Sequence, residues 1–439
     1  MKIRSVLLAA TAVLTMIVAP VPLAGAAQMA GCTIPTVWNP VGKTSINSTP
    51  KLQTRNGVQV SGWAQTDGNV LAGHLMTFNN GVQAVAIGGN FTKITQPDGK
   101  VVPARNLAVV RVLDGTVIYG AQSLDGYVRA FASYGRDLYL AGNFKTVNGK
   151  AHPGIALLST TSWEVSGWKP LVSGNTVRSI QVTASTVYFA GNGRVQAVRR
   201  SDGVKVWDLI TDNVVRTLLL NPSGTLLYAG GFFDVIGGVP VTHLARITLS
   251  TGKVDPSWKP VLARNTGIGD RGAWDGDNPG VMTWFKRADG VTNLIVGGVG
   301  TQSIRSFSTA SSNQRWGYTT EADTQGLAVV GNTIAIGFHR KHGNVWTQGC
   351  QIPFFGAQFT GDEGWLDPWW DPYLSGNETS WSVASQSGGG GIGAIVTDPV
   401  NRKVIVLGDF QKWGASCNLD TLACTGGLPM RGAAIYDYS

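Results

Sequence analysis

The chain has 439 residues, of which 14% are charged and 58 are Gly, and its formal net charge is +9. Its Lys and Arg residues are scattered without a basic run, which argues against a nucleic-acid-binding protein. Low charge, abundant Gly and 15 Trp are together typical of an all-β protein with many turns.

The first segment has the layout of a secretory signal peptide. Lys2 and Arg4 precede an apolar run over residues 6–19, and small residues follow up to Ala26. The run is shorter than the roughly 20 apolar residues of a membrane span, and no later stretch reaches that length. We therefore expect cleavage after Ala26, at the end of a signal peptide over residues 1–26, and a secreted mature chain that is extracellular or associated with the cell envelope.

A Gly-rich phrase recurs along the mature chain and indicates a repeat architecture. Its copies occupy residues 85–94, 138–149, 227–238 and 404–414. A shorter strand precedes the phrase, a third strand follows it, and an element with Trp and Pro, such as residues 167–170, closes the unit. Four short strands joined by Gly-rich turns predict the blade of a β-propeller.

The repeats predict a seven-bladed β-propeller as a single domain over residues 27–439. First strands are expected near Val70, Val128, Val177, Val215, Val281, Leu327 and Ile392. The last blade lacks a fourth strand, whereas residues 37–40 and 58–63 are unpaired copies of the closing strand. The second copy matches residues 164–168 more closely, so we expect this N-terminal strand to complete the last blade and close the ring. A solenoid and a six-bladed ring are the alternatives.

The repeated phrase resembles a known repeat. Together with the Leu-Ala-x-hydrophobic strand and the element at residues 255–258, it is similar to the delta-60 repeat of secreted bacterial β-propellers, which belong among the kelch-like and galactose-oxidase-like rings. The resemblance covers nearly the whole mature chain, and only residues 297–300 and 336–339 depart from it by lacking the Asn-Phe pair. It implies a propeller fold and an extracellular location, and it supplies no catalytic residues.

The four cysteines of this exported chain are expected to be oxidised. They are Cys32, Cys350, Cys417 and Cys424. Of the three pairings, we favour Cys417 with Cys424, which closes a short loop, and Cys32 with Cys350. Lipidation of Cys32 is the alternative, because residues 29–32 are an imperfect lipobox.

Long segments at residues 264–279, 340–353 and 362–391 fall where propeller loops gather on one face. Two of them carry aromatic rings and carboxylates, which suit the apolar faces and the hydroxyl groups of a sugar. The candidate ligand-binding residues there are Trp346, Trp381, Asp362, Glu363, Asp371 and Glu378. The carboxylates would also supply an acid and a base to a glycosidase. Asp367 is instead expected in an ordinary fourth strand, because residues 366–369 match 254–258.

No set of metal ligands stands out, and we expect no cofactor. Three aspartates at residues 270, 275 and 277 have oxygen ligands for Ca²⁺, but their spacing differs from that of a calcium loop and is typical of a turn. His339 and His342 lack further ligands. His243 occupies a position filled by Asn106 and by glycines in other repeats, so we expect it to be a surface variant.

Arg129, Arg178 and Arg216 each follow the central Val of a first strand, in three consecutive blades. The equivalent positions elsewhere are expected to be Leu71, Met282 and Gly393. Repeat symmetry places the three arginines at one level around the central channel. Either each guanidinium group is paired with a neighbouring blade, or the three form an anion site.

The sequence thus predicts a secreted, non-catalytic propeller that binds a polymer, a glycan of the envelope or the environment, through its loop-rich face. The first alternative is an extracellular hydrolase or lyase that acts on a polysaccharide. The second is a protein-interaction scaffold, which would use the same face without a sugar.

Overall fold

The structure is a computed structural model. It describes residues 63–174, 176–262, 278–299, 303–319, 323–331, 333–338, 343–347, 350–354, 356–360, 366–367, 391–410, 412–413, 416–417, 424–425, 428–429 and 431–437. In these residues every regular element is a strand, and the strands form antiparallel sheets, so the predicted all-β class is confirmed. The predicted signal peptide and residues 27–62 lie outside the described residues.

Short sheets follow one another along the chain. The first sheet has the order β2 (Asn69–Thr77), β3 (Gln83–Asn90), β6 (Leu107–Arg111) and β7 (Val117–Gly120). The second contains β8 (Val128–Tyr134), β9 (Asp137–Gly142) and β12 (Ile155–Ser159). An isolated bridge between Leu158 and Val165 stands in the place of its fourth strand.

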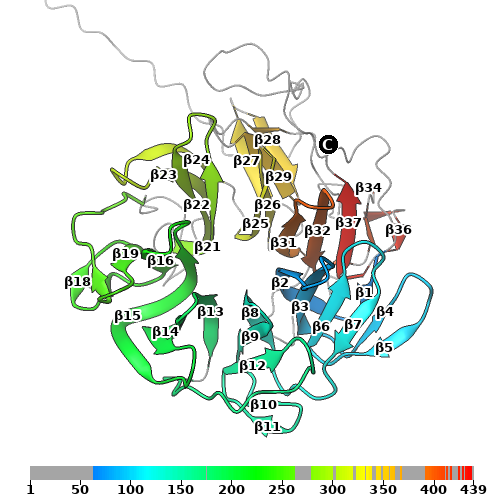
Figure 1. Cartoon of the computed structure of the whole chain (residues 1–439). Coiled ribbons are helices and arrows are strands. Elements are labelled where there is room, and N and C mark those ends of the chain that lie inside the picture. Colours follow the sequence, from blue (N-terminus) through cyan, green and yellow to red (C-terminus); the bar gives the residue numbers. More distant parts are fainter. Residues whose placement is uncertain are drawn as a thin grey trace, which may run out of the picture.

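The next two sheets are continuous with each other. Their path is β13 (Val177–Val182), β14 (Thr186–Arg199), β15 (Lys205–Leu220), β16 (Leu226–Gly231), β19 (Leu244–Thr248) and β20 (Lys253–Val254). β14 folds back on itself at Gly193, which has φ of 76°. Its two ends therefore meet, and the Arg200 N–H donates to the Ser185 carbonyl at 2.8 Å. β15 pairs first with β14 and, from Val215 onward, with β16. Figure 1 shows it as a long curved strand.

Three further sheets complete the series. One has the order β21 (Asn278–Lys286), β22 (Thr292–Val299), β23 (Ser303–Ser308) and β24 (Gln314–Thr319). The next has β25 (Thr324–Val330), β26 (Thr333–Phe338), β29 (Gly356–Thr360) and β30 (Leu366–Asp367). The last has β31 (Ile392–Asp398), β32 (Lys403–Gly408) and β37 (Ala433–Asp437). Asp367 therefore lies in a fourth strand, as predicted.

Each first strand lies beside the first strand of the next sheet. In order, these strands are β2, β8, β13, the second part of β15, β21, β25 and β31, and each contacts its successor. β31 also contacts β2, so the series ends where it began. In Figure 1 the sheets stand around a common centre with these first strands innermost. The space that they surround is called the channel below.

The core lies between neighbouring sheets, because the second strands are buried on both faces. In β9 every residue from Leu138 to Gly142 is buried, as expected for a strand that is covered on both sides. Tyr139 meets Trp168 edge to face at a centroid distance of 5.4 Å, and Tyr228 meets Trp258 in the same way at 5.0 Å. These pairs explain why Tyr recurs in the phrase and Trp in the closing element.

Small hairpins leave three sheets between the second and the third strand. They are β4 (Lys93–Thr95) with β5 (Val101–Pro103), β10 (Thr146–Val147) with β11 (Lys150–Ala151), and β17 (Val235–Ile236) with β18 (Val239–Pro240). A carboxylate just before each first strand accepts two backbone N–H bonds from its hairpin, at 2.7 to 3.1 Å; these are Asp67, Asp125 and Asp212. The three aspartates thus fix the loops that surround one end of the channel.

Trp63 lies in the core between the last sheet and the first. Its side chain is 2% exposed and packs in one cluster with residues of both sheets, among them Leu407 and Val85. The Nε1–H donates to the carbonyls of Arg111 and Val112 at 3.0 and 3.1 Å. The adjoining β1 (Gln65–Thr66) pairs with β4, and the Thr66 N–H donates to the Arg431 carbonyl, just before β37, at 3.1 Å.

The boundary between the second and third sheets is built in the same way. The Trp168 Nε1–H donates to the carbonyl of Arg199, at 3.4 Å. Arg199 ends a third strand, as Arg111 does in the first sheet. Trp63 therefore makes, at the boundary of the last and first sheets, the contact that Trp168 makes inside the series.

The residue before the third strand adopts a left-handed conformation in four sheets. The φ angles are 63° for Asn106, 77° for Gly154, 60° for His243 and 73° for Gly432. These positions are equivalent, as predicted, but the prediction that His243 is a surface variant is wrong. His243 is 6% exposed and its Nε2 lies 3.6 Å from Asp234 Oδ1, because the position faces the junction of hairpin and sheet.

Candidate functional site

Every first strand has a register irregularity at the same place. In each strand it directly follows the residue that pairs near the end of the second strand. The residues inserted there are Leu71, Arg129, Arg178, Arg216, Gly280, Gln325 and Gly393. An inserted residue of this kind has no partner in the ladder and bends its strand. The irregularity therefore places these residues at one level around the channel.

The register corrects the predicted equivalence of Met282. In β21 the irregularity falls between Pro279 and Val281, so Gly280 occupies the arginine position and Met282 lies two residues deeper. The error arises because Val281 resembles the central Val of other first strands, whereas Pro279 takes the place of that Val. The equivalences of Leu71 and Gly393 are confirmed.

Arg129, Arg178 and Arg216, called the arginine cluster below, lie at the end of the channel from which the hairpins emerge. Val128, next to Arg129, pairs with Gly142, and the loop that carries β10 and β11 begins directly after Gly142. Arg178 Nε donates to Asn192 Oδ1 at 3.5 Å, and Asn192 lies in the turn of β14. The cluster thus faces the loop-rich end.

Each member of the arginine cluster is half-buried, and the three make few contacts of their own. The Arg216 guanidinium carbon lies 5.6 Å from the centre of the Phe232 ring, a cation–π distance. Arg129 Nε is buried, and within the described residues it has no hydrogen-bond partner. Among the residues that the structure describes, none of the three guanidinium groups forms an ion pair with a carboxylate.

The three charges act on one another although they come from three sheets. Burial, and then the charge of Arg178, lowers the pKa of Arg129. Burial lowers the pKa of Arg178 as well. For Arg216, burial and the two other arginines lower the pKa to about 10, and the charge of Asp323, just before β25, opposes this. All three guanidinium groups stay protonated at neutral pH.

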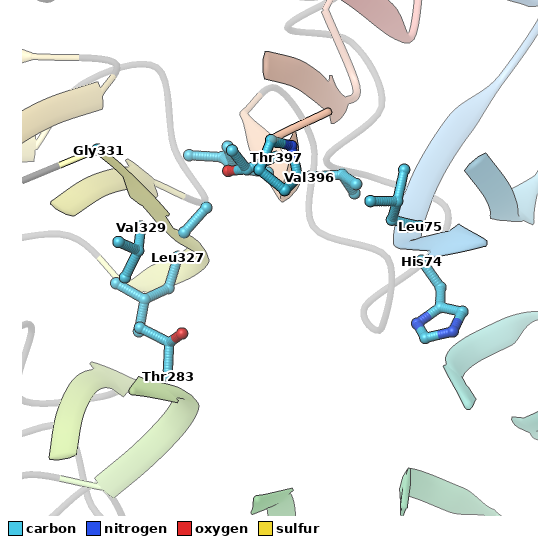
Figure 2. Close-up of a pocket in the computed structure, with 12 residues that line it drawn as sticks. His74, Leu75, Thr283, Leu327, Val329, Gly331, Val396 and Thr397 are labelled. Atoms are coloured by element: carbon cyan, nitrogen blue, oxygen red, sulfur yellow. The ribbon is translucent and has the colours of Figure 1, made fainter. Parts of the chain in front are cut away.

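A cavity of about 610 Å³ lies deeper in the channel. Its walls come from β2, β21, β25 and β31, and Figure 2 shows the side chains of these strands arranged around an open centre. This channel cavity is lined by Leu75, Leu327, Val329, Val396, Thr283, Thr397, His74, Ala328, Ile395, Pro399 and two glycines. Its size is within the range of about 300–1,000 Å³ that is typical of small-molecule sites.

His74 is the titratable residue among the described residues that line the channel cavity. Its Nε2 lies 2.8 Å from Ser133 Oγ of β8, so the ring spans from the first sheet to the second. Burial lowers the pKa of His74 to about 4, which leaves the imidazole neutral at neutral pH. In Figure 2 the His74 side chain lies on the opposite side of the open centre from Leu327 and Val329.

Of the other predicted glycan-binding residues, Trp346 alone is among the residues that the structure describes. Trp346 lies in β27 (Gly343–Thr347), opposite Gln351 of β28 (Cys350–Phe354), in a hairpin that leaves the sixth sheet. Asp362, Glu363, Asp371, Glu378 and Trp381 lie outside the described residues, as do Cys32, the three aspartates at 270–277 and the two histidines at 339 and 342.

The predicted partners Cys417 and Cys424 lie opposite each other in the pair of β34 (Ser416–Cys417) and β35 (Cys424–Thr425). A neighbouring pair joins β33 (Lys412–Trp413) to β36 (Leu428–Pro429). In the described ranges, no three His, Cys, Asp or Glu side chains are placed to hold a metal ion. No helix in those ranges has the length and apolar character of a membrane span.

Sequence reasoning found the arginine cluster but missed its surroundings. Asn192 and Phe232 directly follow the Gly-rich ends of second strands, so their place beside the cluster had a sequence signal. The channel cavity had no sequence signal, because Leu327 and Val329 resemble the alternating residues of any strand. A scan of known family models finds no match to this chain, and a search of curated proteins finds no similar sequence.

Proposed function

We propose that the chain is a secreted seven-bladed β-propeller of the delta-60 type, closed by an N-terminal strand that ends at Trp63. The order of contacts among the first strands supports the ring. The hydrogen bonds of Trp63 support the closure, since they repeat those of Trp168. The likeness of residues 58–63 to 164–168 agrees with both.

The protein's function in this proposal is the non-catalytic binding of an acidic glycan at the loop-rich end of the channel. The observation that carries it is the arginine cluster, which holds three positive charges close together, offset only in part by the charge of Asp323 near Arg216. Half-buried like charges repel each other, and Arg does not lose its proton to relieve this. An anion would relieve it, because carboxylates and sulfates accept two parallel bonds from one guanidinium group.

A glycan that carries uronic or sulfated sugars suits the geometry. The cluster lies at the end of the channel from which the described hairpins emerge, and this is where a chain end or a side branch of the glycan would bind. The candidate glycan contacts of the predicted long segments, among them Trp346, belong to loops of the same class. A hydrolase or lyase would require the carboxylates at residues 362–378 as well.

Binding of polygalacturonate to the full chain tests this function. Replacement of Arg178 by Ala should weaken binding by at least about tenfold, the loss of one charge-assisted hydrogen bond, and the difference should shrink as salt is raised. Arg199→Ala is the matched control, because it removes the same charge from an exposed pair with Asp202. Melting temperatures of both variants should stay near that of the parent.

Two outcomes would contradict the proposal. If Arg178→Ala binds polygalacturonate as the parent does, or if it unfolds at a much lower temperature, the cluster is a structural feature and no anion site. Incubation with the polymer should also release no new reducing ends or unsaturated products. Release of either would show a polysaccharide-acting enzyme in place of a binding protein.

A further inference from the structure

The arginine cluster and the channel cavity occupy opposite arcs of the same ring of first strands. The cluster comes from β8, β13 and β15, whereas the cavity is walled by β2, β21, β25 and β31. The two are also offset in depth. Counted from the inserted residue, the cavity begins two residues further along β2, β25 and β31, at Gly73, Leu327 and Ile395. At about 3.3 Å per residue, this is about 7 Å deeper.

The cavity walls select an uncharged group with an aliphatic part. Leu75, Leu327, Val329 and Val396 supply branched aliphatic surface, and no Asp, Glu, Lys or Arg is among the described residues that line the cavity. His74 is neutral and already bonded to Ser133 through Nε2. A charged group would lose its hydration there without a partner, so any charge on a ligand must stay at the level of the arginines.

We propose that the channel binds a small amphipathic carboxylate, whose carboxylate lies on the arginine cluster and whose aliphatic body occupies the channel cavity. The ligand would lie across the channel from one arc to the other. This inference uses the same arginines as the proposed function but does not require a polymer. A medium-chain fatty acid of about eight carbons is a suitable probe, since its extended length exceeds the axial step of about 7 Å and leaves carbons to cross from one arc to the other.

Octanoate, butyrate and octan-1-ol are the probes, each titrated into the full chain by calorimetry. Octanoate should bind, and octan-1-ol should bind at least about tenfold more weakly because it lacks the charge. Each added methylene between butyrate and octanoate should strengthen binding by up to about fourfold, the effect of burying one CH₂ group. Equal affinities of octanoate and octan-1-ol would overturn the proposal, as would affinities independent of chain length.

Two variants separate the ends of the ligand. Arg178→Ala should weaken octanoate binding at least about tenfold and leave octan-1-ol unchanged. Val329→Thr, which keeps the side-chain shape and adds a hydroxyl to the wall, should weaken both probes and leave polygalacturonate binding unchanged. No effect of Val329→Thr on either probe would place the aliphatic body elsewhere and overturn the inference.

The outcome for octanoate is distinguishable from the outcome for the glycan. Binding of polygalacturonate with no detectable binding of octanoate by a fully folded protein refutes this inference and leaves the proposed function in place. Binding of octanoate without binding of polygalacturonate does the reverse.

Discussion

At the scale of single residues, Asn106 shows how a turn position can hold two sheets together. Its side chain is 8% exposed, its Nδ2 donates to the carbonyls of Leu124 and Gly126 at 3.0 and 3.1 Å, and its Oδ1 accepts from the Phe91 N–H at 3.2 Å. Leu124 and Gly126 lead into the second sheet. Asn also tolerates the left-handed conformation better than most residues. One residue therefore both adopts the turn conformation and hydrogen-bonds to the backbone that leads into the next sheet.

Replacement of Asn106 by Ala should therefore destabilise the protein by about 2–4 kcal/mol, because it leaves buried backbone groups unpaired and because Ala tolerates a positive φ less well than Asn does. Asn106→Gly keeps the conformation and should cost about 1 kcal/mol less than Asn106→Ala. Urea unfolding of both variants gives the comparison. The explanation fails if the two variants are equally stable or if neither differs from the parent.

The arginine cluster marks the limit of inference from single residues. Its three members could be aligned from the sequence, because each follows a Val in a first strand with otherwise similar neighbours. The groups that face them, such as Asp323 near Arg216, could not be predicted, since these depend on where side chains of other sheets end. The prediction that His243 is a surface variant was wrong for the same reason. The sequence shows which residues precede and follow His243, but not which residues it contacts across the junction of hairpin and sheet.

At the scale of the strands, the pair of β34 and β35 bears on the predicted disulfide between Cys417 and Cys424. Residues directly opposite in antiparallel strands have Cα atoms about 4.5–5.5 Å apart, within the range of about 4.4–6.8 Å for a disulfide. We expect peptide mapping under non-reducing conditions to recover the two cysteines in one linked peptide. A peptide that joins Cys350 to Cys417, or free thiols at these positions, would contradict it.

The contribution of that disulfide to stability should be small. Closing so short a loop stabilises the folded state by about 2–3 kcal/mol on the chain-entropy model. The double variant Cys417→Ser, Cys424→Ser should therefore fold, with a lower unfolding midpoint. A much larger loss would mean that the loop also supports the last sheet.

Strands were easier to predict than their register. The repeated phrase gives buried second strands because Gly, Tyr and β-branched residues fit a strand that is covered on both faces, and β9, β16 and β32 appear where it occurs. The register of β21 was missed by two residues, since Pro279 hides the expected Val. The continuity of β15 was also not foreseen, because a turn was expected between one unit and the next.

At the scale of the whole molecule, the junction of the last and first sheets decides whether the ring is closed. Trp63→Ala should destabilise the protein by about 3–5 kcal/mol, the usual cost of removing a buried Trp side chain. Trp168→Ala is the matched control, because Trp168 makes the corresponding contact at another boundary. Chemical unfolding of both should give losses of similar size if the two boundaries are equally closed.

Removal of residues 27–64 extends this test to the predicted closing strand. The shortened chain should aggregate or unfold at a lower temperature, because the last sheet then has an uncovered edge. A shortened chain with the melting temperature of the parent, or a Trp63→Ala variant as stable as the parent, would show that the N-terminal segment is not part of the ring.

The continuity of β15 has a consequence for how the molecule tolerates new chain ends. Between the first and second sheets the chain passes through residues 121–127, which lie between β7 and β8 and where circular permutation or the insertion of a foreign domain interrupts little pairing. Between the third and fourth sheets there is no such loop, since Thr211 pairs with Ile236 and Val214 with Asn192. A permutant opened there loses ladder contacts to both neighbours, so we expect it to be less stable than one opened at residues 121–127.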